Sequence, residues 1–169
     1  MPATATAALE QAMARIVPGS RLAYREEVHH PALLSPEVAE GVLWVEGDGT
    51  LVRAQSWPRA ERTAIGTRFL SVQRGEDPVP NLVPIPAVLR PMVEMLRALA
   101  SGSLAGLRAA YRLKFGAEGG GWRVALLPED GMSETEPGAV RLFGCGAELQ
   151  LLSVATGGDG ERRLRVVLP

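Results

Sequence analysis

The feature that most constrains this chain is a series of short runs in which apolar and polar residues alternate, separated by glycine or proline. In the first run Leu22, Tyr24, Glu26 and Val28 share one face. Successive side chains of a strand point to opposite faces, so a two-residue period predicts strands with one buried face. The Gly-Asp-Gly segment 47–49 separates two such runs, and Asp-Gly between alternating runs is a strong hairpin signal.

Nine or ten strands are predicted, and every connection between them is compatible with a hairpin. They cover residues 21–28, 38–46, 51–57, 62–66, 68–74, 111–115, 122–127, 139–143, 148–154 and 162–168. Helical spacing is predicted only over 6–17, 87–100 and 103–110. Because helices do not alternate with strands, parallel βαβ units are not expected. The fold class is therefore α+β, with one large, curved antiparallel sheet and its helices on one face.

The chain of 169 residues has the length of one domain, and we expect residues 1–169 to form it. Within it, residues 1–18 supply the N-terminal helix. Residues 75–110 form a proline-rich loop followed by lid helices. Proline removes ladder hydrogen bonds, so the segment from Gly75 to Pro91 is predicted as a loop or a sheet edge whose apolar residues cover hydrophobic surface.

Charge and composition exclude several kinds of partner. With 18 basic and 19 acidic residues and no long run of either sign, the chain lacks the basic face that nucleic-acid binding requires. No window of about 18 apolar residues exists, so no transmembrane helix is predicted. Cys145 is the only cysteine, and His29 and His30 point to opposite faces of a strand. Neither a metal nor a cofactor is expected.

Catalytic motifs are equally scarce. A Glu26–His30 dyad is conceivable, but solvated histidines at the end of a strand are the favoured interpretation. No Gly-x-Ser-x-Gly elbow is present, and the Gly-Gly-Asp-Gly segment 157–160 is predicted as a hairpin turn. Cys145 has no base or cation nearby in the sequence. We therefore predict no catalytic residue and no enzyme, while an enzyme sensitive to His29, His30 or Cys145 stays a minor alternative.

A curved sheet with helices over its concave face either packs solidly or leaves a cavity for a hydrophobic ligand. Periodicity alone favours the solid core. The methionine Met92 on the predicted lid helix suits an adaptable lining, although methionines are commoner in cores. Both alternatives therefore remain open at the level of the residues.

Ten short matches in the right order make the chain resemble the outer-membrane lipoprotein carrier (LolA) family. The matching segments include Leu-Ala-Tyr-Arg-Glu at 22–26, Gly-Val-Leu-Trp-Val at 41–45, Leu-Val-Arg at 51–53, Trp-Pro at 57–58, the strand pair 61–72, the helix 91–102, Trp-Arg-Val-Ala-Leu-Leu-Pro at 122–128, Arg-Leu-Phe-Gly at 141–144 and Asp-Gly at 159–160. The chain is most similar to the LolA-related proteins that accompany polyene-pigment and fatty-acyl biosynthesis genes in Gram-negative bacteria.

This resemblance implies an unclosed half β-barrel with a helical lid over its concave apolar face. It implies a non-enzymatic periplasmic carrier or chaperone, whose signal peptide has been removed and which exchanges an acyl, lipoprotein-lipid or polyene-like ligand with membrane-associated donor and acceptor proteins. Two departures limit the carry-over. The family's lid-holding Arg-Pro pair corresponds to Gly47 and Asp48 here, and the chain ends at Pro169 where the carriers have an extension.

The ligand-binding residues that we predict come from the sheet and from the lid. The sheet residues are Leu22, Tyr24, Leu43, Val45, Leu51, Leu70 and Val72, and the lid residues are Leu89, Met92, Val93, Leu96 and Leu99. A register slip of one residue would turn each strand's set outward. The alternative to a carrier is a periplasmic interaction or sensor domain with a filled core, which binds a protein partner at the lid or at an open sheet edge.

Overall fold

The computed structural model describes residues 2–86, 90–128 and 131–167. Eleven strands form one antiparallel sheet in the order β6-β5-β4-β3-β2-β1-β11-β10-β9-β8-β7. They are β1 (Leu22–His29), β2 (Glu37–Val45), β3 (Leu51–Trp57), β4 (Glu61–Ile65), β5 (Phe69–Arg74), β6 (Asn81–Pro84), β7 (Arg112–Glu118), β8 (Gly121–Leu127), β9 (Val140–Cys145), β10 (Glu148–Gly157) and β11 (Gly160–Val167). The sheet is not closed, since β6 and β7 form its two ends. The predicted α+β half-barrel is confirmed.

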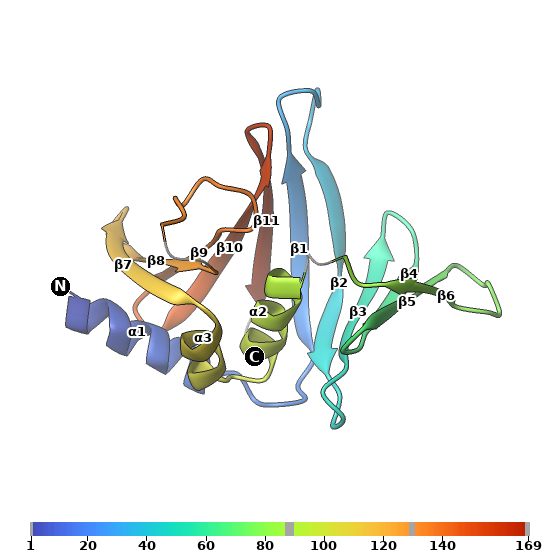
Figure 1. Cartoon of the computed structure of the whole chain (residues 1–169), viewed down its shortest axis with the longest axis horizontal. Coiled ribbons are helices and arrows are strands. Elements are labelled where there is room, and N and C mark those ends of the chain that lie inside the picture. Colours follow the sequence, from blue (N-terminus) through green and yellow to red (C-terminus); the bar gives the residue numbers. More distant parts are fainter. Residues whose placement is uncertain (1, 87–89, 129–130, 168–169) are drawn as a thin grey trace.

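Three helices accompany the sheet: α1 (Pro2–Ala14), α2 (Arg90–Ala100) and α3 (Leu104–Ala110). Figure 1 shows all three on one side of the fanned strands. The helix α1 packs against β7, β8 and β10, whereas α2 packs against α3, β2 and β3. Ser103 caps α3, because its Oγ atom accepts a hydrogen bond of 3.0 Å from the amide of Gly106.

One strand was not among those predicted. Residues 81–84 pair with β5 to form β6, inside the segment that was predicted as a loop or a sheet edge. Pro80 precedes this strand and Pro84 is its last residue, and proline is tolerated in a sheet mainly at its edge. The strand pairs with β5 alone, so a proline-rich sequence can occupy it. The N-terminal helix also begins earlier than predicted, at Pro2 instead of Thr6.

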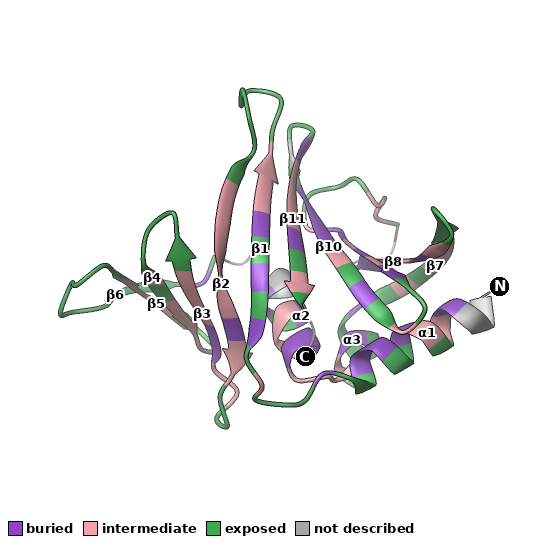
Figure 2. Ribbon diagram, turned by 180° about the vertical axis from the view of Figure 1, so that it is seen from behind, coloured by how far each residue is buried: buried purple, intermediate pink, exposed green. Residues whose placement is uncertain are grey.

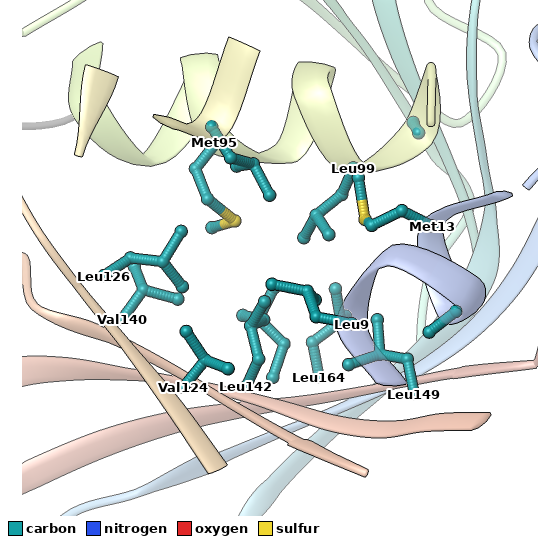
Figure 3. Close-up of a cluster of buried hydrophobic side chains, with 14 of the residues drawn as sticks. Leu9, Met13, Met95, Leu99, Val124, Leu126, Val140, Leu142, Leu149 and Leu164 are labelled. Carbon is teal, nitrogen blue, oxygen red and sulfur yellow. The ribbon is translucent and has the colours of Figure 1, made fainter. Parts of the chain in front are cut away.

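The two halves of the sheet differ in how they are covered. Figure 3 shows side chains from α1 (Leu9, Met13) and α2 (Met95, Leu99) meeting those of Leu142 and its neighbours on the sheet. Five of the seven residues of β8 are buried, whereas β4, β5 and β6 contain only half-buried and exposed residues (Figure 2). The half around β8 is therefore a filled core, and the half from β3 to β6 is open.

A candidate ligand-binding cavity under the lid helix

A cavity of about 260 Å³ lies between α2 and the concave face of the sheet. Of the twelve described residues that line it, eight are aliphatic, and the four polar ones are Glu26, Arg53, Thr63 and Arg162. The aliphatic residues are Leu43, Leu51, Ile65, Val93, Leu96, Leu152, Val154 and Leu164. A concave apolar site with a few polar groups is typical of small-molecule binding sites.

Strand register explains why these residues meet. Leu51 lies opposite Ile65, and Arg53 lies opposite both Leu43 and Thr63. Residues directly opposite one another in an antiparallel pair share a face of the sheet, so this row points to the same side. The helix α2 contributes Val93 and Leu96 to the lining, which three-residue spacing places on one side of a helix.

The structure separates the predicted binding residues into groups. Those that line the cavity are Leu43, Leu51, Val93 and Leu96. Leu22, Tyr24, Val45 and Leu99 do not line it; they belong to the core cluster or pack against it, and the same cluster also includes Leu43 and Leu51 of the cavity wall. Leu70 and Val72 are half-buried on β5, opposite Ile65 and Thr63, but they do not line the cavity. Leu89 and the side chain of Met92 lie outside the part of the chain that the structure describes.

The sequence analysis missed the polar residues of the cavity and its contributions from β4, β10 and β11. The buried carboxylate of Glu26 is the group around which the polar residues gather, because its side chain is only 6% exposed. Its Oε2 atom lies 2.5 Å from Nη2 of Arg53, and its Oε1 atom accepts a hydrogen bond from Nη1 of Arg162. We call Glu26, Arg53 and Arg162 the polar cluster. The signal was present: Glu26 stands in an otherwise apolar alternation.

Small residues on β2 allow this contact across an intervening strand. β2 lies between β1 and β3, and it places Ala39 opposite Glu26 and Gly41 opposite Tyr24. The guanidinium of Arg53 can therefore cross β2 to reach Glu26. On the way it lies 5.1 Å from the ring centre of Tyr24, and burial raises the pKa of that phenol.

A second, more open cavity of about 560 Å³ adjoins the first. The three residues of the polar cluster line both cavities. The other residues around the outer cavity are Val28, Pro36, Glu37, Val38, Ala39, Gln55, Trp57 and Pro58. The polar cluster therefore stands at the boundary between an apolar inner cavity and a mixed outer one.

The lid helix is fastened to the sheet by Arg97, whose side chain is 17% exposed. Its Nε atom donates a hydrogen bond of 2.8 Å to the carbonyl of Gly49, and Nη2 donates to the carbonyls of Ile65 and Gly66 at 3.2 and 3.1 Å. Nη1 lies 2.6 Å from Glu94. The arginine that holds α2 to the sheet is therefore a residue of α2 itself.

The imagined Glu26–His30 dyad does not form, because Glu26 is bound by the two arginines. His30 instead accepts a hydrogen bond at Nδ1 from the amide of Ala32, while His29 lies 3.0 Å from Glu27. That hydrogen bond from His29 lowers the pKa of the Glu27 carboxyl.

Cys145 is exposed. Among the described residues, no three His, Cys, Asp or Glu side chains are grouped so that they could hold a metal ion. Within the same residues, no helix is long and apolar enough to span a membrane.

Comparison with known proteins finds matches among solved structures alone: no protein-family model and no curated sequence matches the chain. A LolA superfamily protein from Nitrosomonas europaea is 11% identical, with 97% of this chain and 91% of that chain covered and a TM-score of 0.47. The lipoprotein LppX from Mycobacterium tuberculosis is 12% identical, with coverages of 98% and 94% and a TM-score of 0.46. A DUF1329 family protein from Desulfovibrio piger is 7% identical, with coverages of 97% and 91% and a TM-score of 0.49. A LolA superfamily protein is thus among the structural neighbours, but these identities and scores are too low to assign a family or a function.

Proposed function

We propose that this protein is a non-enzymatic carrier that binds an acyl, lipoprotein-lipid or polyene-like hydrophobic ligand in the cavity under α2, and that it works in the periplasm. The observation that carries the proposal is the inner cavity itself, which eight aliphatic side chains line next to a filled core. A side-chain set of this kind favours an alkyl or polyene chain over a polar ligand.

The energy available to such a ligand is large. Burial of ten methylenes contributes roughly 8 kcal/mol before the costs of binding, at ~0.8 kcal/mol for each methylene. Loading and release need no catalytic group. They do need access, and α2, which closes the cavity, is held to the sheet by hydrogen bonds from Arg97 and by the packing of Met95 and Leu99 in the core.

Protein purified from its native periplasm is the material for the first test. Mass spectrometry of a solvent extract should find one acyl or polyene species at close to one copy per chain. In parallel, the neutral dye N-phenyl-1-naphthylamine should bind the emptied protein. The variant Leu96→Glu places a carboxylate in the cavity wall, and it should abolish dye binding while the thermal unfolding temperature stays near that of the wild type.

The matched control is Leu34→Glu, which introduces the same side chain at a fully exposed loop position and should leave dye binding unchanged. An empty extract together with no dye binding would overturn the carrier proposal. So would a Leu96→Glu variant that binds the dye as the wild type does.

A second candidate function is the binding of a protein partner at the open edge of the sheet. All four residues of β6 are exposed, and the exposed fractions of Leu82 and Val79 beside it are 65% and 76%. An extended segment of a partner could pair with this edge. If the extract is empty and the dye does not bind, Leu82→Lys tests this candidate. The variant should then capture less of the partner than the wild type does in a pull-down.

A further inference from the structure

The polar cluster carries a net positive charge. Glu26 supplies one negative charge, and Arg53 and Arg162 supply two positive charges around it. Among the residues that the structure describes, no other carboxylate forms an ion pair with Arg53 or Arg162. Glu61 is paired with Arg74 at 3.0 Å, and Glu37 is an exposed residue on the wall of the outer cavity.

The guanidiniums of Arg53 and Arg162 have more N–H donors than they use in the hydrogen bonds of the cluster. Each guanidinium has five N–H groups. Glu26 binds Nη2 of Arg53 and Nη1 of Arg162, and Arg53 donates further to Gln55 at 3.2 Å. Most of the N–H donors of the pair are therefore available to another acceptor. The side chains of Arg53 and Arg162 are 28% and 44% exposed, so an acceptor in the outer cavity can reach them.

The position of the cluster determines which part of a ligand would meet this charge. Its three residues line the apolar cavity on one side and the mixed cavity on the other. The cluster is thus placed to meet the other end of a ligand whose alkyl chain fills the inner cavity and extends into the outer one. An anionic group at that point would gain charge-assisted hydrogen bonds, whereas a cationic group would meet two arginines.

We propose that the polar cluster is a headgroup site, and that the ligand is an anionic amphiphile whose carboxylate or phosphate accepts hydrogen bonds from Arg53 and Arg162. This inference rests on the proposed carrier function and adds the chemical class of the ligand. While the cavity is empty, the Glu26 carboxylate binds both arginines and keeps them together.

The test compares four ligands with the same alkyl chain and different ends: dodecanoate, dodecyl phosphate, dodecanol and dodecyltrimethylammonium. Each is titrated against the wild-type protein loaded with N-phenyl-1-naphthylamine, and dye displacement gives the affinity. Both anions should bind at least roughly tenfold more tightly than dodecanol, the difference expected from one charge-assisted hydrogen bond. Dodecyltrimethylammonium should bind most weakly. The ratio between dodecanoate and dodecyl phosphate identifies which anion the site prefers.

Three variants assign the preference to the cluster. Arg53→Gln and Arg162→Gln each leave Glu26 with one arginine, so the fold is kept, and each should weaken anion binding roughly tenfold more than it weakens dodecanol binding. Glu26→Gln removes the competing carboxylate and should strengthen anion binding. The control is Arg25→Gln, which removes an equal positive charge beside Glu26 on β1 but on the opposite face of the sheet, where Arg25 pairs with Glu40 at 2.5 Å.

The outcomes separate the two proposals. If dodecanol binds as tightly as dodecanoate, or if Arg162→Gln weakens both ligands equally, the headgroup site is wrong and the carrier function stands. If no ligand of the four displaces the dye and the dye itself does not bind, the carrier function fails and the headgroup site fails with it.

Discussion

Arg97 of the lid helix donates a hydrogen bond of 2.8 Å through Nε to the carbonyl oxygen of Gly49, in the turn between β2 and β3. The same guanidinium reaches the carbonyls of Ile65 and Gly66 at the end of β4. One side chain on α2 thus holds the ends of two hairpins, on the side of the helix where the cavity is lined by β3 and β4. This contact therefore helps to hold α2 against the sheet.

Arg97→Gln should therefore loosen the lid. The substitution removes most of these hydrogen bonds, so we expect a loss of about 1–3 kcal/mol in the free energy of unfolding and faster release of bound dye. Urea denaturation measures the first quantity, and stopped-flow fluorescence of N-phenyl-1-naphthylamine measures the second. The control is Arg90→Gln at the exposed first position of the same helix. Equal release rates in wild type and Arg97→Gln would show that the lid opens without breaking this contact.

Gly41→Ala should destabilise the protein through the backbone of the neighbouring strand. A Cβ atom at Gly41 would lie 2.1 Å from the carbonyl oxygen of Ala54 and 2.8 Å from the Cα atom of Gln55. Because backbone atoms cannot turn aside as the end of a side chain can, β2 and β3 must move apart, which costs about 1–3 kcal/mol. Thermal or urea unfolding measures the loss. Gly47→Ala is the matched control, since no heavy atom lies within 4 Å of its Cβ position, and it should be close to neutral.

Glu161 should make stability depend on pH. Burial acts to raise the pKa of its carboxyl, but a hydrogen bond from Ser153 and the charges of Arg163 and Arg141 outweigh burial and lower it. A folded-state pKa below the unfolded value of 4.5 means that the ionised carboxylate stabilises the fold above that pH. This contribution is lost as the pH falls through the folded-state pKa.

Glu161→Gln should consequently cost about 1–2 kcal/mol near pH 7, and the cost should shrink steadily once the pH falls below about 4.5. Urea denaturation of both proteins across this range gives the difference. The control is Glu148→Gln, at a side chain that is 66% exposed, which should show little difference at any pH. A cost for Glu161→Gln that stays constant down to acid pH would contradict the role assigned to its charge.

Much of the sheet could be predicted because strand alternation is local. Leu22 and Tyr24 were placed on one face, and the structure buries both in the core on the side of the helices. The same parity holds in β3, where Leu51 lines the cavity. The strand β6 could not be found in this way. The prolines in and beside it are typical of a loop, and only its pairing with β5 makes it a strand.

The candidate site was predicted less completely than the fold. The lid residues Val93 and Leu96 follow from helical spacing alone, and they do line the cavity. The wall contributed by Leu152 and Leu164 depends on β10 and β11, which lie far along the chain from the other sheet residues of the cavity. No local pattern indicates that these distant strands share a cavity with β3 and β4.

The sequence by itself determined the class of the fold, because a two-residue period and glycine turns allow only strands joined by hairpins. It also determined that Glu26 would point to the apolar face. Only the tertiary structure decided what that carboxylate meets. Pairing of the first strand with the last, β1 with β11, brings Arg162 to Glu26 across 136 residues of chain. Likewise, the docking of α1 on β7, β8 and β10 fills one half of the sheet and leaves the other half open. Both outcomes depend on contacts between segments far apart in the chain, which local periodicity does not encode.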